Sequence, residues 1–484
     1  MGITNFTKTV KALYEKSVKN NWLESYDYLY IDINACLHRV GYISNTPNEI
    51  YDKIDGLIMN ITQNVNPSRG VIIASDGPAP MAKLILQRLN RLKSAQCMKA
   101  DDDDFSVSSL NFTPGTVFMN SLENRLAKLK KKIELMYCID VEMIMNKPDE
   151  TEIKVKKYVC EMIEKHPEYT HCIVSDDADV IVMSMNFESL HNVYILHKRQ
   201  QDLAYINLNV MLDEHTNVYG CSRKPGHDFM AINVMLGNDY IKKIEFIDYE
   251  KLWKSYKHAL NANPEGLITD DIKVSRTFLC DMFAWISNNL SPRFANRFKV
   301  KNYDKQLHED YIDGLLWCID TYNDGQCNRY DYLYSHKDSP SSSGLLLTLA
   351  GMDKYLKMTK NDSKPMSPGL YSILLIPKKA KTLLDSNLRD LTESDDISML
   401  YEEEICTKCF KYNTEISNIT AEMKYSVIKK GYKSPTAMGF YKAKISKLRS
   451  KLNKHKTKHK NITTRDIYKI KKYYDKYMES HKII

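Results

Sequence analysis

Short apolar runs alternate with amphipathic segments through the first half of the chain. The apolar runs are rich in Val, Ile and Tyr, which favour strands, and they occupy residues 28–34, 71–77, 171–185 and 191–197. Between them, apolar side chains recur at the three- and four-residue spacing of a helix in segments 81–95, 116–135 and 151–166. Alternation of strand and helix is typical of a mostly parallel sheet with helices on its faces. We therefore expect an α/β fold with a mostly parallel central sheet, in which 171–185 is a strand with its exit turn.

The second half of the chain is mainly helical in pattern. Residues 277–290 (TFLCDMFAWISNNL) are the clearest helix, and 440–484 combine helical spacing with many lysines. Two segments, 97–112 and 335–344, have the composition of loops. We expect three parts: an N-terminal core over 1–250, a helical continuation of it over 251–345, and a helical, Lys-rich C-terminal region over 346–484.

Acidic residues follow the apolar runs at the points where strands are expected to end. They are Asp32, Asp76, Glu150, Glu152, Asp177, Asp179 and Asp239. In an open α/β sheet, ligands bind beyond the carboxyl ends of the strands. Clustered carboxylates repel one another unless cations neutralise them, and hard oxygen ligands suit Mg²⁺ or Mn²⁺. The pattern predicts a metal-dependent enzyme that acts on phosphate esters.

Spacing alone leaves ordinary explanations open for several of these acids. Asp149 and Glu152 have the spacing of a helix capping box. Asp177 and Asp179 could lie in a solvated loop, and Asp239 follows a helical segment where a simple turn is expected. The metal hypothesis is favoured because seven acids share the same position relative to apolar strands.

The helix expected after the second strand has one polar face. Lys83, Gln87 and Arg91 follow one another at four-residue spacing, with Asn90 beside them, and the opposite face is apolar. A face that carries two cations next to a metal site suits a phosphate group. An ordinary amphipathic surface helix remains the alternative.

Charge is distributed unevenly along the chain. The net charge is +8, yet residues 424–484 hold 19 Lys and Arg against 3 acids, so the remainder is net acidic. A basic stretch dotted with Tyr is typical of a contact with nucleic acid, and a solvated helical surface is the alternative.

The cysteines and the lengths of the apolar runs bear on the cellular setting. The 11 Cys are scattered, mostly within apolar runs, as in reduced intracellular proteins. No run reaches the roughly 18 apolar residues of a membrane span, and the start lacks the apolar core of a secretory signal. We expect an intracellular protein without membrane contact, with the cytoplasm favoured over the nucleus. Cys406 and Cys409 form a single CxxC pair, which is a weak signal for zinc without a second pair or a nearby His.

A series of longer motifs is more specific than any of these features. In order, they are MGITNF at the start, YIDINACLH (30–38), SDGPAPMAKLILQRLNRLKSA (75–95), FTPGTVFM (112–119), PDETEIK (148–154), HCIVSDDADVI (171–181), DFMAINVMLGNDY (228–240) and GLLWCIDTYNDGQCNRYDYLYSH (314–336). This series resembles the XRN family of 5′→3′ exoribonucleases over about residues 1–345, with weaker similarity to about residue 385. The resemblance implies a PIN/FEN-like nuclease core, in a compact version of the sort that a large DNA virus or a minimal genome could carry.

The resemblance also implies roles for individual residues. It makes the seven acids the ligands of Mg²⁺ or Mn²⁺, with two ions expected. It makes Lys83, Gln87, Arg88 and Arg91 the pocket for a 5′-terminal phosphate. It makes His38, which spacing alone leaves open between a core histidine and a stacking group, the partner of the terminal base.

Three departures from the family pattern affect these expectations. Asn90 stands where the family usually has Arg, which removes one cation from the phosphate pocket. PDETEIK lacks the two glycines and the His of the family's PGEGEHK. Asp176 replaces an apolar residue and adds negative charge beside the expected metal site.

The sequence therefore predicts a divalent-metal-dependent exoribonuclease that degrades single-stranded RNA from a 5′-monophosphate end and releases mononucleotides. A flap-endonuclease-like DNA nuclease is the first alternative, but the segment after Asp239 has none of the glycines of a helix-hairpin-helix. An inactive RNA-binding protein on the same fold is the second alternative, and the presence of all seven acids argues against it.

Overall fold

The computed structural model describes Val10 and residues 12–96, 108–199, 202–289, 303–336, 338–357, 361, 363–401, 406–430, 435–456 and 463–481. The chain divides into two compact units. The first comprises Met1–Arg39, Asp52–Lys83 and Arg125–Pro365, and the second comprises Val40–Tyr51, Leu84–Asn124 and Met366–Ile484. The chain passes between the units within the helices α2 (Ile33–Gly41), α3 (Pro47–Val65), α4 (Met81–Gln96) and α5 (Val117–Tyr137).

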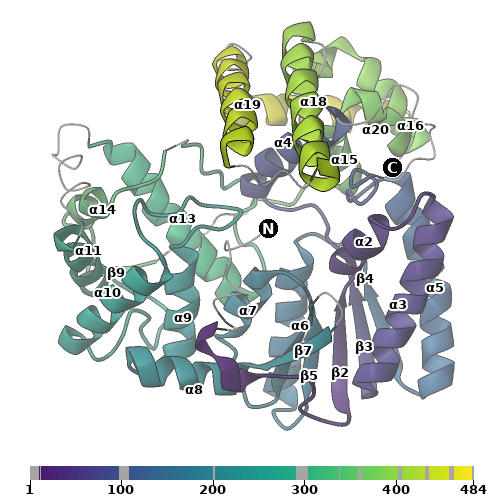
Figure 1. Cartoon of the computed structure of the whole chain (residues 1–484). Helices are drawn as coiled ribbons and strands as arrows, with labels where there is room; N and C mark the ends of the chain where they lie inside the picture. The colour runs from purple at the N-terminus through teal and green to yellow at the C-terminus, as the bar shows by residue number, and fades with distance from the viewer. Residues whose placement is uncertain are drawn as a thin grey trace. The chain divides into compact units, whose positions relative to one another are not determined.

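A seven-stranded sheet lies in the first unit, with helices around it (Figure 1). In spatial order its strands are β1 (Val18–Lys19), β7 (Asp202–Asn207), β6 (Val193–Arg199), β5 (His171–Val174), β2 (Tyr26–Asp32), β3 (Pro67–Ala74) and β4 (Asp140–Ile144). The five strands from β6 to β4 run parallel. At one edge, β7 runs antiparallel to β6, and β1 runs antiparallel to β7. The mostly parallel sheet predicted from the sequence is confirmed.

The order of the strands reverses between β2 and β5. From β2 the chain adds β3 and β4 on one side, and it then returns to add β5 and β6 on the other. Ile31 of β2 pairs with Ile73 of β3 and with Val174 of β5, so these three strands end at nearly the same level. In open parallel sheets, such a reversal leaves a crevice beyond the carboxyl ends of the strands, where ligands bind.

The helices predicted around the sheet are present, with one correction. α4, α5 and α6 (Thr151–Lys165) match the predicted segments, whereas only the first part of 171–185 is a strand. Residues Ala178–Ser184 form helix α7, and every one of its side chains is buried. The extended exit turn expected there was wrong because a short, mainly apolar run fits a buried helix as well as a strand. Of the loop predicted over 97–112, residues 97–107 lie outside the described residues.

The rest of the first unit is helical, as predicted. It contains α8 (Leu208–Tyr219), α9 (Pro225–Val234), α10 (Tyr249–Ala262), α11 (Arg276–Asn288), α13 (Lys305–Asp324) and α14 (Ser342–Leu349), with a short pair of strands, β8 (Val274–Ser275) and β9 (Tyr355–Leu356). One apolar core joins these helices to the sheet, and Trp253 and Trp317 are fully buried in it. The helices and the sheet of the first unit are therefore held together by a shared apolar core.

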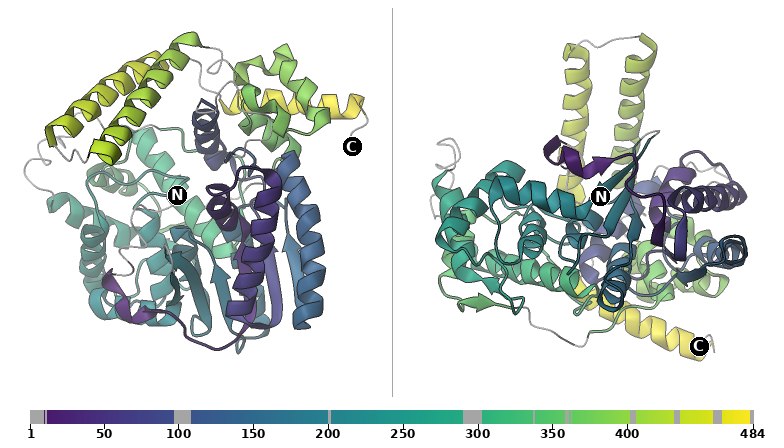
Figure 2. Two further views of the ribbon diagram at one scale, coloured as in Figure 1. Left: turned by 45° about the vertical axis from the view of Figure 1, so that its right-hand side comes forward. Right: turned by 90° about the horizontal axis from the view of Figure 1, so that it is seen from below.

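The second unit is built from helices (Figure 2). Its elements after residue 365 are α15 (Pro368–Leu375), α16 (Ser386–Arg389), α18 (Thr407–Lys430), α19 (Pro435–Lys456), α20 (Thr464–Ser480) and the 3-10 helices Lys378–Leu383, Asp390–Glu393 and Asp395–Leu400. The mainly helical C-terminal part predicted from the sequence is confirmed. Within the described residues, no helix is both long and apolar enough to cross a membrane.

Candidate active site

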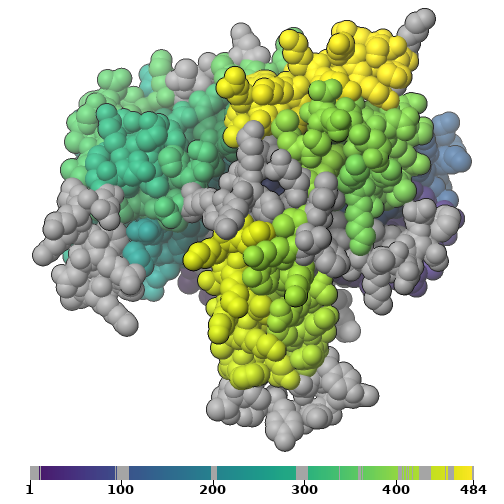
Figure 3. All heavy atoms as spheres, turned by 90° about the horizontal axis from the view of Figure 1, so that it is seen from above, coloured from purple at the N-terminus to yellow at the C-terminus, as the bar shows by residue number. Residues whose placement is uncertain are grey.

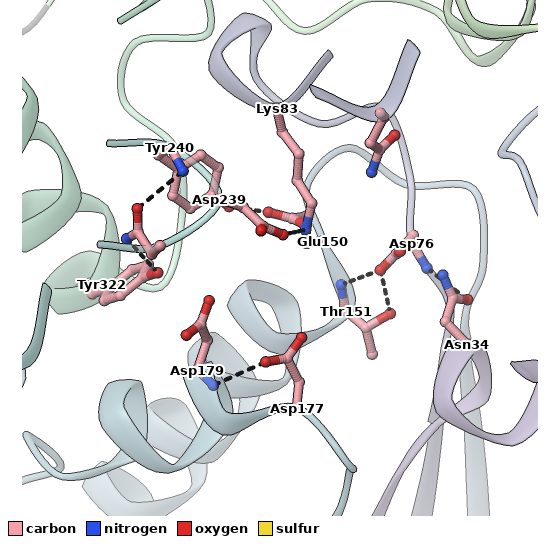
Figure 4. A network of polar contacts seen from close by, with 12 residues as sticks. Asn34, Asp76, Lys83, Glu150, Thr151, Asp177, Asp179, Asp239, Tyr240 and Tyr322 are labelled. Carbon is pink, nitrogen blue, oxygen red and sulfur yellow. Dashed lines mark hydrogen bonds and ion pairs between the residues drawn. The ribbon is translucent and has the colours of Figure 1, made fainter. Parts of the chain in front are cut away.

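The seven predicted acids come from the ends of neighbouring strands and the starts of the helices that follow them. Asp32 ends β2, and Asp76 follows β3. The other five lie at the start of α6 (Glu150, Glu152), at the start of α7 (Asp177, Asp179) and after α9 (Asp239). All seven side chains belong to buried or half-buried residues of the first unit. Figure 4 shows Asp76, Glu150, Asp177, Asp179 and Asp239 directed toward one region of space.

Asp32 and Asp76 are held in place by hydrogen bonds from neighbouring loops. The Asp32 carboxylate accepts from the backbone N–H of Asn34 at 2.9 Å and from the Ser175 hydroxyl at 3.0 Å. The Asp76 carboxylate accepts from both the backbone N–H and the hydroxyl of Thr151, each at 3.0 Å. Asp76, which follows β3, therefore caps the first turn of α6. These hydrogen bonds join the loop after β3 to the loop that leads into α6.

A close approach of backbone to backbone fixes the loop after β3. The N–H of Gly77 donates to the carbonyl of Asp149 at 2.9 Å. A Cβ atom at Gly77 would lie 1.7 Å from the carbonyl oxygen of Lys147, so only glycine fits there. This contact brings the Asp76 loop against the loop that leads to Glu150.

Lys83 is the cation at the centre of the acids. Its ammonium group forms an ion pair with Glu150, and it lies 3.2 Å from the carboxylate of Asp239. The second oxygen of Glu150 accepts a hydrogen bond from the Tyr240 hydroxyl. The capping-box explanation for this segment does not apply, because Glu150 itself is the N-cap residue and no side chain caps the helix from that position.

Aromatic side chains support this group from α13. The Tyr240 ring meets Trp317 edge-on, with ring centroids 4.9 Å apart, and Trp317 stacks on Tyr332. The Trp317 indole N–H donates to the carbonyl of Arg329 at 3.0 Å. The aromatic motif near 314–336 therefore packs behind the acids.

Asp177 and Asp179 lie together at the start of α7. Asp177 is the N-cap residue, and its carboxylate accepts from the N–H of Asp179 at 3.0 Å. Acidic side chains are favoured at a helix N-terminus because the unpaired N–H groups there are partly positive. The solvated-loop explanation fails, since Asp179 is buried.

The electrostatics of the site show an excess of negative charge. Burial, with a contribution from Asp76, raises the pKa of Asp32 to about 7. Burial also raises the pKa of Glu152 well above its usual value, although Lys83 acts in the opposite sense. For Lys83 itself, burial lowers the pKa, but Glu152, Asp239 and other nearby carboxylates outweigh it and raise the pKa above the usual value. One lysine thus leaves much of the carboxylate charge uncompensated.

This donor set fits hard divalent cations. Carboxylate oxygens are the ligands that Mg²⁺ and Mn²⁺ prefer, and a cation would remove the charge excess that raises the pKa values. In the part of the chain that the structure describes, no three of these carboxylates have oxygen atoms that all lie within 4.8 Å of one another. The acids are spread around Lys83, as expected of like charges that repel one another.

Asp176, the extra acid in this region, is paired with cations. The Arg39 guanidinium donates to both of its oxygens, at 2.6 and 2.5 Å, and His197 Nδ1 lies 3.5 Å away. A bidentate pair with Arg offsets the carboxylate charge. The added negative charge expected from the sequence is therefore largely balanced.

One lysine near the acids was missed in the interpretation of the sequence. Lys154 donates to the carbonyls of Ser75 and Lys147, at 2.5 and 3.0 Å, and burial lowers its pKa to about 8. It joins the same two loops as the Gly77 contact. Its position as the last residue of PDETEIK, four residues after Glu150 and on the same side of a helix, was a usable signal.

The residues predicted to bind a terminal phosphate lie on α4. Lys83 belongs to the first unit, and Gln87, Arg88 and Arg91 belong to the second. The Gln87 side-chain oxygen accepts from the Tyr371 hydroxyl at 2.8 Å. Arg88 is buried, and its guanidinium donates to the carbonyls of Leu374 and Leu400. In this arrangement Arg88 holds the second unit together, which differs from the phosphate contact expected of it.

His38 lies on α2 in the first unit and is half-buried. It is neither the fully buried core histidine of one interpretation nor a fully exposed side chain. Its helix begins directly after Asp32, so the ring is on the element that follows β2.

Comparison with known proteins finds a family to which the N-terminal region is similar. Residues 1–201 match the model of the XRN 5′-3′ exonuclease N-terminus. This region is therefore similar to the XRN family. The chain is also similar to 5′-3′ exoribonuclease 1 of Saccharomyces cerevisiae, with 23% identity over 63% of the chain and 23% of that protein. A similar match to 5′-3′ exoribonuclease 1 of Homo sapiens has 23% identity over 66% of the chain and 21% of that protein.

The chain thus spans less than a quarter of the length of either XRN relative. Among solved structures, the catalytic core of Rad2 in complex with a DNA substrate is similar, with 12% identity, a TM-score of 0.36, and coverage of 70% of this chain and 92% of that one. A TM-score this low supports no comparison of sites.

Proposed function

We propose that the chain is a divalent-metal-dependent 5′→3′ exoribonuclease that removes mononucleotides from single-stranded RNA with a 5′-monophosphate. The observation that carries this proposal is that seven buried or half-buried carboxylates follow strand ends, begin helices or, for Asp239, follow α9 around a parallel sheet with a switch point, and that Lys83 is paired with two of them, Glu150 and Asp239. The similarity of the N-terminal region to the XRN 5′-3′ exonuclease family supports RNA as the substrate.

The seven acids are proposed to hold Mg²⁺ or Mn²⁺. They offer more oxygen ligands than one octahedral ion takes, which favours two ions. The metal would supply Lewis-acid activation of the scissile phosphate and of an attacking water. The chain's own groups orient the ligands: Ser175 and Asn34 hold Asp32, and Thr151 holds Asp76.

The polar face of α4 is proposed to bind the 5′-terminal phosphate. Lys83, Gln87 and Arg91 lie at four-residue spacing on this helix, so their side chains leave it on one side. Tyr371 orients the Gln87 amide, and Arg88 holds the helix through main-chain carbonyls. His38 is proposed to stack on the terminal base, which reads no sequence.

The proposal extends to the rest of the substrate and its setting. The basic residues of the C-terminal region would hold the downstream RNA through its phosphates. The scattered thiols, none of them in a disulfide among the described residues, suit a reducing compartment, for which we propose the cytoplasm.

The test uses RNAs that carry a label at either end, each with a 5′-monophosphate, a 5′-hydroxyl or a 5′-triphosphate, in Mg²⁺ and in chelator. Release of the labelled 5′ nucleotide from the monophosphate RNA alone, in Mg²⁺ alone, would support the whole proposal. Equal degradation of all three ends would remove the phosphate pocket and keep the nuclease.

Two other outcomes would replace the proposal. Cleavage of a flapped DNA duplex without cleavage of RNA would establish the endonuclease alternative. Binding of RNA with no cleavage in either Mg²⁺ or Mn²⁺ would establish an RNA-binding protein on a nuclease fold.

A further inference from the structure

The helices α18 and α19 of the second unit form a hairpin with very little apolar core. They run side by side in both ribbon and space-filling views (Figures 2 and 3). The buried core described between them consists of Ile419, Ile445 and Leu448, with Tyr412, Ile416 and Tyr441 partly buried against it. A two-helix element of this size buries too little apolar surface to be held firmly by packing alone.

Three metal-ligand side chains meet at the open end of this hairpin. Cys406 immediately precedes α18, Cys409 lies in its first turn, and His455 lies in the last turn of α19. The Cys406 sulfur is 3.2 Å from Nε2 of His455, and one ligand atom from each of the three residues lies within 4.8 Å of the others. Cys409 is buried, and the other two residues are half-buried.

We propose that Cys406, Cys409 and His455 bind one Zn²⁺ ion that joins the start of α18 to the end of α19. Two sulfurs and one imidazole nitrogen are the ligands that zinc prefers, whereas the hard ions suited to the carboxylates avoid thiolates. In a tetrahedral site with Zn–S of about 2.3 Å and Zn–N of about 2.0 Å, a sulfur and a nitrogen lie about 3.5 Å apart. The separation of Cys406 and His455 is close to this value.

The Cys-x-x-Cys spacing places both sulfurs at the start of α18, as in known zinc sites.

The fourth position of the ion is left to a water or another ligand. The sequence has a second histidine, His459, four residues after His455, but it lies outside the described residues. The proposed site has only Cys406, Cys409 and His455 as its ligands. All three ligands belong to the second unit, whereas the seven carboxylates belong to the first.

The experiment measures zinc in the purified full-length chain after loading with Zn²⁺ and removal of excess ion. We expect one zinc per chain in the wild type, and at least a tenfold loss in Cys406→Ser, Cys409→Ser and His455→Ala. Cobalt in place of zinc should give thiolate-to-metal absorption in the wild type and none in these variants.

Matched variants separate ligation from folding. Cys138→Ser and His481→Ala remove exposed residues of the same types elsewhere, and both should keep the zinc. His455→Cys exchanges one zinc ligand for another, so it should keep the zinc that His455→Ala loses.

Three results would overturn the proposal. They are a wild type that holds no zinc after loading, zinc content unchanged in the three ligand variants, and a Cys406–Cys409 disulfide found by mass spectrometry in chain kept under reducing conditions.

Discussion

Lys83 illustrates how one side chain can serve both the fold and the site. It is buried, pairs with Glu150, and lies close to Asp239. A buried carboxylate without a partner is costly, so the lysine stabilises the acids in the folded chain. The same ammonium group stands at the start of the polar face of α4, where a phosphate would meet it.

Asp176 and Asp177 are neighbours in sequence with different surroundings, and they make a matched pair of variants. Asp177→Asn removes a carboxylate from the proposed metal site, and we expect RNA cleavage to fall by at least about 100-fold. Asp176→Asn removes a carboxylate that is paired with Arg39, and cleavage should change by less than about threefold because that pair lies half-exposed. Single-turnover cleavage and RNA affinity would be measured for both variants.

In this comparison, RNA affinity should stay within about threefold for both variants, since neither acid is proposed to contact RNA directly. Equal losses of cleavage in the two variants would count against the assignment of Asp177. A loss of binding that matches the loss of cleavage would do the same.

Asp228, in the DFMAINVMLGNDY motif, supports the fold from inside α9. Its carboxylate accepts from the N–H groups of Leu267 and Ile268, at 3.0 and 2.7 Å, and from the Tyr256 hydroxyl at 2.8 Å. Burial outweighs these hydrogen bonds and raises its pKa from 3.8 to about 6. The folded chain therefore keeps a proton between about pH 4 and pH 6 that the unfolded chain releases, so the stability that Asp228 contributes falls as pH rises through this window.

The prediction for Asp228→Asn follows from these contacts. The amide puts an N–H group among backbone donors, and we expect a loss of about 1–3 kcal/mol in the free energy of unfolding. The difference from wild type should be larger near pH 4 than near pH 7, because only the wild type titrates in this window. Urea unfolding across this pH range would measure it, with the exposed Asp271→Asn as control. A difference that does not vary with pH would contradict the raised pKa.

At the scale of elements, the sequence predicts what periodicity and propensity control. The strands, the helices α4 to α6 and the helical second half follow from apolar spacing. Helix α7 was missed because its run is buried on every side and has no polar face to set a period. The position of Arg88 was also unpredictable, since a guanidinium that bonds to main-chain carbonyls of distant segments leaves no local pattern.

The basic surface of α19 is an element-scale prediction for RNA binding. Lys442, Lys444 and Lys447 are exposed on this helix. If they bind RNA phosphates, replacing all three by Gln should weaken RNA binding and make its dependence on salt less steep, by about 0.7 in the log–log slope for each phosphate that is no longer neutralised. Replacing the exposed Lys128, Lys131 and Lys132 of α5 by Gln removes the same charge from another helix and serves as control.

Binding would be measured by fluorescence anisotropy with one RNA over a range of salt concentrations. Equal weakening in the two triple variants would show that only net charge matters. No change of slope in the α19 variant would show that this helix does not bind the RNA.

At the scale of the whole chain, the sequence predicts which acids lie near one another, but it does not predict which cations neutralise them. Strand ends predict that Asp32, Asp76 and Asp177 lie near one another, because the carboxyl ends of parallel strands share one edge of the sheet. The pairing of Asp176 with Arg39 depends on side chains 137 residues apart in the chain. His455 and Cys406 are 49 residues apart, which is why the CxxC pair was a weak signal until the hairpin brought them together.

The chain is proposed to hold two kinds of metal site whose ligands differ in chemistry. A variant at either site should therefore lose the response to one metal and keep the response to the other. Mg²⁺ prefers oxygen ligands over thiolates. By binding the folded wild type it should add about 2.7 kcal/mol to the free energy of unfolding at a concentration 100 times its dissociation constant, and so raise the melting temperature. Asp177→Asn should show a smaller rise in melting temperature with Mg²⁺ and should keep the zinc. Cys409→Ser should lose the zinc and should keep the full rise in melting temperature with Mg²⁺. Variants at independent sites should also show additive losses of stability.

Thermal unfolding with and without Mg²⁺, combined with zinc analysis of the same samples, would measure both effects. If either variant abolished both responses, the two sites would be one cooperative structure, and the separate roles proposed for the carboxylates and for the hairpin would have to be given up.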